Sequence, residues 1–180
     1  MQTALRKPWI SPDEYLTLER TADVRHEYVD GEVYAMVGAS RRHSTITLNL
    51  AEAIRPAARR RGCEAYATDI KVRVETANAY YYPDLVVTCD TRDNDPYVVH
   101  SPSLIVEVLS PSTEAIDRRE KRMHYQTIPS LREFLLVAQD ERLIEVYRRT
   151  ASGWICEIIR EGELLLESVG ITLSVDEIYA

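Results

Sequence analysis

Two carboxylic acids stand at the ends of apolar, strand-like segments, where an unpaired charge would be costly. Asp84 follows Pro83 and leads into the apolar residues 85–87, and Glu107 interrupts the apolar run 104–109. A carboxylate in such surroundings needs a bound cation, a partner or a raised pKa. If the two segments are neighbouring strands, we expect the two side chains to converge on a site for Mg²⁺ or Mn²⁺, which prefer oxygen ligands.

Two other roles are open for the same acids. Asp84 could close a turn after Pro83 while Glu107 pairs with a buried arginine, which would make both residues structural. The two could also act as a general acid and base pair on another substrate, as in glycosidases. The apolar strands and a nearby lysine, Lys121, favour the metal site over the acid and base pair.

The segment 114–126 is expected to form a helix that Thr113 can cap. Asp117 and Lys121 are four residues apart and share one face of that helix, with His124 nearby. The helix could return Lys121 toward the strand that carries Glu107. The competing interpretation is an ordinary surface ion pair, worth only a few tenths of a kcal/mol.

These residues also carry a resemblance to a known family. The matching segments are residues 82–87 and 104–113, the triplet Asp117, Lys121 and Tyr125, and beyond them residues 26–32, His43 and 131–137. In these segments the chain resembles the Uma-type family of restriction-endonuclease-like proteins, part of the PD-(D/E)XK nuclease superfamily. The resemblance covers nearly the whole chain.

The resemblance implies an α/β fold with a restriction-endonuclease-like central mixed β-sheet flanked by helices, and a strand-rich C-terminal half. It implies Asp84 and Glu107 as metal ligands and Lys121 as the catalytic cation. The superfamily pattern places its lysine two residues after the glutamate, where this chain has Leu109, so Lys121 is a lysine that has moved to the next helix. Further residues near the metal would be Glu27, Glu32, His43 and Asp117.

The function expected from these features is metal-dependent hydrolysis of phosphodiester bonds in nucleic acid, with DNA as the expected substrate. Lys121 would orient the attacking water or stabilise developing charge. The alternative is a nuclease fold that works as a non-catalytic binding or assembly module. The formal net charge of −7 favours that alternative, because phosphate binding depends on Lys and Arg.

Three groups of arginines could contact a nucleic acid, although a solvated helix face is the favoured role for any single arginine. The group beside the lysine is the preferred one: Arg118, Arg119 and Arg122. The others are Arg41 with Arg42, and Arg55 with Arg59, Arg60 and Arg61. The tyrosines at 80–82 could stack on a base, but packing in the core or an interface is the favoured role.

The pattern of the chain predicts one domain, 1–180, of mixed α/β order. Ser11 and Pro12 signal a first helix to about residue 19, and Asp30-Gly31 a hairpin between two strands. A helix from His43 to about Arg61 should be kinked or divided at Pro56. Further strands are expected at 63–68, 70–75, 80–88, 104–109, 133–138, 142–149, 154–160 and 163–167, before a helical turn at 175–179.

Cys63, Cys89 and Cys156 show no paired motif, and buried reduced thiols are expected. No segment approaches the roughly 20 apolar residues of a membrane span, and the start of the chain lacks a secretory signal, so a soluble cytoplasmic protein is expected. Val146, Tyr147, Trp154 and Ile158 offer apolar surface for a homodimer.

Overall fold

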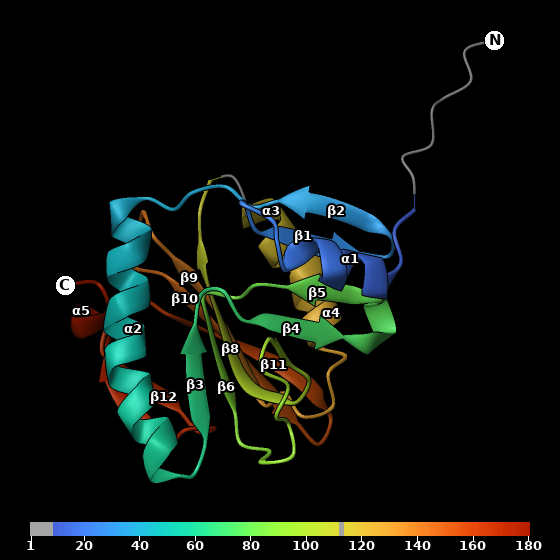
Figure 1. Cartoon of the computed structure of the whole chain (residues 1–180). Helices are drawn as coiled ribbons and strands as arrows, with labels where there is room; N and C mark the ends of the chain where they lie inside the picture. The colour runs from blue at the N-terminus through green and yellow to red at the C-terminus, as the bar shows by residue number, and fades with distance from the viewer. Residues whose placement is uncertain (1–8, 112–113) are drawn as a thin grey trace.

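The computed structural model describes residues 9–111 and 114–180, and a six-stranded mixed sheet forms its centre (Figure 1). Only β8 and β9 are parallel neighbours in this sheet, and the other pairs are antiparallel. The strand order is β11 (Gly153–Ile159), β10 (Ile144–Thr150), β9 (Glu133–Ala138), β8 (Pro102–Leu109), β6 (Leu85–Thr88) and β3 (Glu64–Ala67).

Strand β8 is buried along its whole length, because both faces of the sheet are covered. Leu104, Val106 and Val108 pack in one core layer, and Ile105 and Leu109 pack in the other. This alternation is the period-two geometry of a strand. The predicted central apolar strand is confirmed.

Helix α2 (Arg41–Arg60) covers the first face, together with the hairpin of β12 (Glu163–Leu166) and β13 (Ile171–Ser174) and the short α5 (Val175–Ile178) (Figure 1). The Ser40 hydroxyl accepts from the His43 N–H and caps the start of α2. Gly62, with φ of +72°, follows its end, a conformation open to glycine. Helix α2 runs through Pro56 without a break, so the predicted division there is wrong, and a kink at Pro56 stays a prediction.

The second face is covered by a five-stranded sheet and by the helical segment after β8. Asp30 and Gly31 make the predicted turn between the first two strands, and both have positive φ. Helix α1 (Pro12–Glu19) begins with the predicted capping box at Ser11. The sheet order is β2 (Glu32–Ala35), β1 (His26–Val29), β5 (Ala79–Tyr81), β4 (Lys71–Val74) and β7 (Val98–Val99).

The predicted strand 80–88 is two strands that belong to different sheets. Strand β5 ends at Tyr81 and β6 begins at Leu85, so Pro83 and Asp84 lie in the crossing between them. Proline cannot donate to a strand ladder, which is consistent with a break at this point. The break leaves Asp84 free of regular pairing at the start of β6.

The helical segment predicted at 114–126 is present and consists of three short pieces. A π-helical turn, Asp117–Lys121, joins α3 (Glu114–Ile116) to α4 (Arg122–Tyr125). Such turns are frequent at functional sites. Asp117 and Lys121 are both buried, so a surface ion pair is excluded. The cap predicted at Thr113 lies outside the described residues.

The prediction for the cysteines is wrong. Cys63 and Cys89 form a disulfide. Cys63 directly precedes β3 and Cys89 directly follows β6, and these two strands pair antiparallel. Cys156 is a free, exposed cysteine. Sequence spacing could not reveal that pairing, because it depends on the register of the two strands. In the described part of the chain, no helix is long and apolar enough to cross a membrane.

Candidate active site

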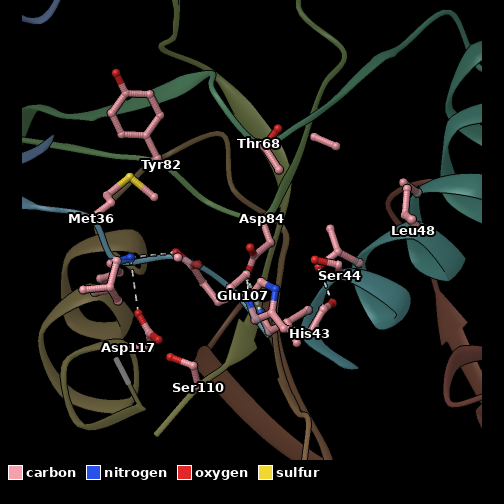
Figure 2. A pocket seen from close by; sticks show the side chains of 18 residues that line it. Met36, His43, Ser44, Leu48, Thr68, Tyr82, Asp84, Glu107, Ser110 and Asp117 are labelled. Carbon is pink, nitrogen blue, oxygen red and sulfur yellow. Dashed lines mark hydrogen bonds and ion pairs between the residues drawn. The ribbon is translucent and has the colours of Figure 1, made fainter. Parts of the chain in front are cut away.

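Strand pairing brings Asp84 and Glu107 side by side. Strands β6 and β8 are antiparallel neighbours with Leu85 opposite Val106. Continuing this register by one residue sets Asp84 beside Glu107. The main-chain N–H of Val108 donates to Asp84 Oδ2 at 2.7 Å, which fixes the aspartate against β8. Figure 2 shows both carboxylates at the centre of one cavity.

Helix α2 supplies a histidine to the same point. His43 Nε2 lies 3.2 Å from Asp84 Oδ2, and both side chains are mostly buried. The hydrogen bond to Asp84 raises the pKa of the His43 imidazole, although burial opposes that shift. The capped first turn of α2 thus places a proton donor against the aspartate.

Two donors from the helical segment after β8 hold Glu107. The Tyr125 hydroxyl donates to Glu107 Oε1 at 2.8 Å, and Lys121 Nζ lies 3.4 Å from the same oxygen. Tyr125 is completely buried and packs edge-on against Phe134 and Tyr81. The aromatic core therefore sets the position of one oxygen of Glu107.

Lys121 is surrounded by carboxylates from three parts of the chain. Its Nζ lies 2.7 Å from Glu27 Oε1 and 3.3 Å from Asp117 Oδ1, in addition to the contact with Glu107. Glu27 belongs to β1 in the other sheet, and its Oε1 also accepts from the main-chain N–H of Tyr82 at 3.1 Å. The side chain of Lys121 is only 6% exposed.

The charges of this cluster are unbalanced. It contains four carboxyl groups and, among the described residues, one lysine: Glu27, Asp84, Glu107 and Asp117 with Lys121. Burial raises the pKa of Glu107 well above its ordinary value, and the nearby carboxylates add to the shift against the opposing effect of Lys121. Burial alone would lower the pKa of Lys121, but its three carboxylate partners raise it well above its ordinary value. Lys121 is therefore a permanent cation at neutral pH.

A cavity of about 480 Å³ opens over these residues. Its polar wall contains Asp84, Glu107, Asp117, Lys121 and His43. Much of the remaining wall comes from α2, from the end of β3 and from the loop before α2. It includes several exposed apolar side chains: Met36, Val37 and Leu48. Figure 2 shows Leu48 and Met36 on opposite sides of the carboxylates.

Several residues expected at the site lie elsewhere. Glu32 is exposed on β2, where it accepts a hydrogen bond from Tyr34. Arg118 pairs with Glu114 and Glu145, and none of the arginines at 118, 119 and 122 lines the cavity. The guanidinium of Arg122 lies over the ring of Tyr147.

Tyr80, Tyr81 and Tyr82 are all buried, as the core-packing interpretation predicts. The hydroxyl of Tyr82 donates to the buried Glu19 at 3.0 Å, and Lys71 Nζ donates to that hydroxyl at 3.3 Å. This network anchors the residue two positions before Asp84. Sequence reasoning missed it and the contact of Tyr125 with Glu107, because both join segments far apart in the chain.

The donor set can be tested against the divalent cation that the resemblance implies. In the described ranges, no group of three or more His, Cys, Asp and Glu side chains is arranged to hold a metal ion. Mg²⁺ needs fewer protein ligands than three, since it is commonly bound through one or two carboxylates with retained waters and substrate phosphates. Asp84 and Glu107 supply two oxygen-bearing groups in a cavity with excess negative charge, so this donor set fits Mg²⁺ or Mn²⁺ and not a thiolate-dependent metal.

Comparisons with known proteins identify the family and the fold. Two proteins of Synechocystis sp. are similar in sequence. "Uncharacterized protein slr1290" is 38% identical over 175 residues, covering 96% of this chain and 92% of that protein. "Uncharacterized protein sll1609" is 34% identical over 139 residues, covering 76% of this chain and 78% of that protein.

A crystal structure from Anabaena variabilis, described as "a putative nuclease belonging to DUF820", superposes with a TM-score of 0.79 at 19% identity. The match covers 94% of this chain and 97% of that one. It shows that the fold is the restriction-endonuclease-like α/β fold expected from the sequence. The profile of the Uma2 family, described as "Putative restriction endonuclease", matches residues 12–176. The chain therefore belongs to the Uma2 family.

Proposed function

We propose that this protein is a metal-dependent nuclease that hydrolyses phosphodiester bonds in nucleic acid, with DNA as the expected substrate. The observation that carries the proposal is the convergence of Asp84 and Glu107 from neighbouring strands, with the charged Lys121 against Glu107. The family description and the nuclease named for the similar structure support it.

Asp84 and Glu107 would hold the divalent cation, Mg²⁺ or Mn²⁺. When bound, the cation would activate water for attack and neutralise negative charge that develops on the phosphoryl group. In the overall reaction a water oxygen adds to phosphorus, the bond from phosphorus to the leaving sugar oxygen breaks, and that oxygen takes a proton.

The chain's own residues have separate tasks in this scheme. Lys121 cannot accept a proton because its raised pKa keeps it charged, so it orients water or stabilises the phosphoryl oxygens. The hydroxyl of Tyr125 holds Glu107 in place, and the main-chain N–H of Val108 holds Asp84. His43 holds Asp84, and Glu27 holds Lys121.

A non-catalytic binding or assembly module is the second candidate. The formal net charge of −7 favours it, because phosphate binding depends on Lys and Arg. A protein that binds no Mn²⁺ and cuts no nucleic acid, while forming a stable complex with a partner, would fit this candidate.

The test is a cleavage assay on supercoiled, linear and single-stranded DNA in Mg²⁺, Mn²⁺ and EDTA. We expect metal-dependent cleavage by the unaltered chain and none by Asp84→Asn or Lys121→Ala. Glu75→Gln is the control, since Glu75 is exposed and does not line the cavity; its Oε1 lies 3.2 Å from Arg73 Nε. Cleavage that survives Asp84→Asn would reject the site, and full activity in EDTA would favour an acid and base pair.

Three further expectations concern the domain, the compartment and the oligomeric state. Residues 1–180 would act as one domain, in the cytoplasm, as a homodimer. The dimer surface must differ from the one first expected, because Val146 and Tyr147 are buried in the core. Of that group, Ile158 on the edge strand β11 is 61% exposed.

A further inference from the structure

Strand β11 forms one edge of the central sheet and is long for an edge strand. It has seven residues, and among the described residues it pairs only with β10. The other edge strands of the two larger sheets are shorter, since β3 and β2 have four residues each and β7 has two. A long free edge presents main-chain N–H and C=O groups that can pair with another chain.

The features by which soluble proteins protect a sheet edge are missing from β11. Its seven residues include no lysine and no proline, and its pairing with β10 has no register shift. Its one charged residue, Glu157, forms an ion pair with Arg148 of the neighbouring strand. The sequence of this edge therefore does not oppose the addition of a further strand.

Apolar side chains flank this edge on both faces of the sheet. Ile155 is 51% exposed and Ile158 is 61% exposed, and their odd spacing places them on opposite faces. Leu165 of β12, 47% exposed, lies on the face of Ile155, because Arg148 opposes Ile155 and donates to the main-chain oxygen of Leu165 at 2.7 Å. Exposed apolar side chains that gather in this way are typical of an interface.

A second copy of β11 fits this edge, because the strand is complementary to itself. Two antiparallel copies pair along all seven residues only when Cys156 lies on the two-fold axis, so that Gly153 of each copy opposes Ile159 of the other. In this register Glu157 opposes Ile155, and no like charges face each other. An axis at Glu157 would instead place two carboxylates directly opposite.

This interface would leave the catalytic cavity open. Strand β8, which carries Glu107, is separated from β11 by β10 and β9. Neighbouring strands lie about 4.8 Å apart, so β8 is roughly 14 Å from the edge. The two central sheets would join into one continuous sheet with a candidate site in each half.

We infer that a second copy of this chain pairs antiparallel with β11, with Cys156 on the two-fold axis, to form a homodimer. The inference goes beyond the proposed function, which expects a homodimer but assigns no surface to it. It does not depend on nuclease activity.

The test measures the mass of the full chain and of charged variants by analytical ultracentrifugation. We expect a mass near twice 20.6 kDa for the unaltered chain. Ile158→Lys should raise the Kd of the dimer at least about tenfold, because the interface would bury an unpaired charge. Leu18→Lys is the control, since Leu18 is 60% exposed on α1, which belongs to neither face of this edge, and it should dimerise like the unaltered chain.

Two substitutions at Ile155 test the register. Glutamate at position 155 would face Glu157 of the other copy, and lysine at the same position would face an opposite charge. Because the two-fold axis repeats each contact, Ile155→Glu should have a Kd about tenfold higher than Ile155→Lys. Circular dichroism and thermal unfolding check that both variants are folded.

The thiol of Cys156 gives a second readout of the register. Directly opposed residues of an antiparallel pair have Cα atoms about 4.5 or 5.5 Å apart, within the range that a disulfide spans. Diamide takes up two electrons and two protons from two thiols, so it should join two copies through Cys156 into a dimer that dithiothreitol separates. Cys156→Ser should still dimerise and should give no cross-linked product.

A chain that sediments as a monomer would overturn the inference. A dimer that Ile158→Lys and Ile155→Glu leave unchanged would also overturn it, since its surface would then lie elsewhere. Equal Kd values for Ile155→Glu and Ile155→Lys, with no cross-link in diamide, would reject the pairing centred on Cys156. None of these outcomes bears on cleavage, which the assay with Asp84→Asn tests separately.

Discussion

The ammonium group of Lys121 lies 2.7 Å from Glu27 Oε1, nearer than it lies to Asp117 or Glu107. Glu27 belongs to β1 of the five-stranded sheet, and Lys121 to the π-helical turn after β8. One oxygen of Glu27 also receives the N–H of Tyr82, two residues before Asp84. Glu27 therefore joins the lysine to the chain segment that carries the aspartate.

Replacing Glu27 with Gln should lower the rate of DNA cleavage roughly ten- to hundredfold. Lys121 would lose its nearest carboxylate and could shift toward Asp117 or Glu107, while the hydrogen bond to Tyr82 can persist. The assay compares initial rates in Mg²⁺, with Glu75→Gln as the control for loss of an ion pair distant from the cavity. An unchanged rate in Glu27→Gln would mean that Glu27 has no positioning role.

Replacing Tyr125 with Phe should lower the free energy of unfolding by about 1.5–3 kcal/mol, because a buried carboxylate loses a donor while the ring packing remains. Tyr125→Ala should lose more, since the ring also contacts Phe134 and Tyr81. Urea unfolding in EDTA measures both variants. Equal stability of Tyr125→Phe and the unaltered chain would show that the bond to Glu107 contributes nothing net.

Replacing Lys121 with Met should destabilise the metal-free protein by about 3–5 kcal/mol, because the buried Glu107 and Asp117 and the partly buried Glu27 lose their cation. The double variant with Asp117→Asn should recover part of this loss, since it removes one of those charges. Thermal unfolding of four chains tests the coupling: the unaltered chain, each single variant and the double variant. If the two substitutions were simply additive, Asp117 and Lys121 would not act as a pair.

Replacing Glu107 with Gln should stabilise the metal-free protein at pH 8, and the gain should shrink toward pH 5. The folded-state pKa of Glu107 is raised above its ordinary value near 4.5, so the folded chain holds more protons than the unfolded chain in the interval between them. The free energy of unfolding contributed by Glu107 is therefore full below that ordinary value and is lost as pH rises through the folded-state pKa. Urea titrations in EDTA at pH 5 and pH 8 measure the difference, and a gain that grows on acidification would contradict this sign.

Thiol titration of the oxidised chain should detect one free cysteine, Cys156, and reduction should expose three. Reduction should also lower the free energy of unfolding by about 3 kcal/mol, as expected for a loop closed over a sequence separation of 26 residues. Three reactive thiols in the unreduced protein would contradict the pairing of Cys63 with Cys89.

Much of the local structure could be predicted because its signals are local. Three features depend on neighbouring residues alone: the cap of α1 at Ser11, the turn at Asp30 and Gly31, and the mostly apolar strand β8. The strand predicted at 80–88 was wrong because its two halves are both strand-like, and only the tertiary structure assigns them to different sheets.

The candidate site also contains residues that the sequence predicts and residues that only the fold brings together. Asp84, Glu107 and Lys121 stood out because charged groups in apolar or helical patterns are visible in the sequence. The partners of Lys121 and Glu107 from other segments, Glu27 and Tyr125, acquire their contacts only through the packing of two sheets around the π-helical turn. No sequence pattern could have separated Glu27 from the nearby Glu32, which is exposed.

The most direct test of the central claim is a calorimetric titration of the metal-free chain with Mn²⁺, repeated for Asp84→Asn and for Glu75→Gln. We expect saturable Mn²⁺ binding by the unaltered chain and by Glu75→Gln, and a loss of that binding in Asp84→Asn. Mn²⁺ binding that Asp84→Asn leaves unchanged, or its absence from the unaltered chain, would contradict a metal site at Asp84 and Glu107.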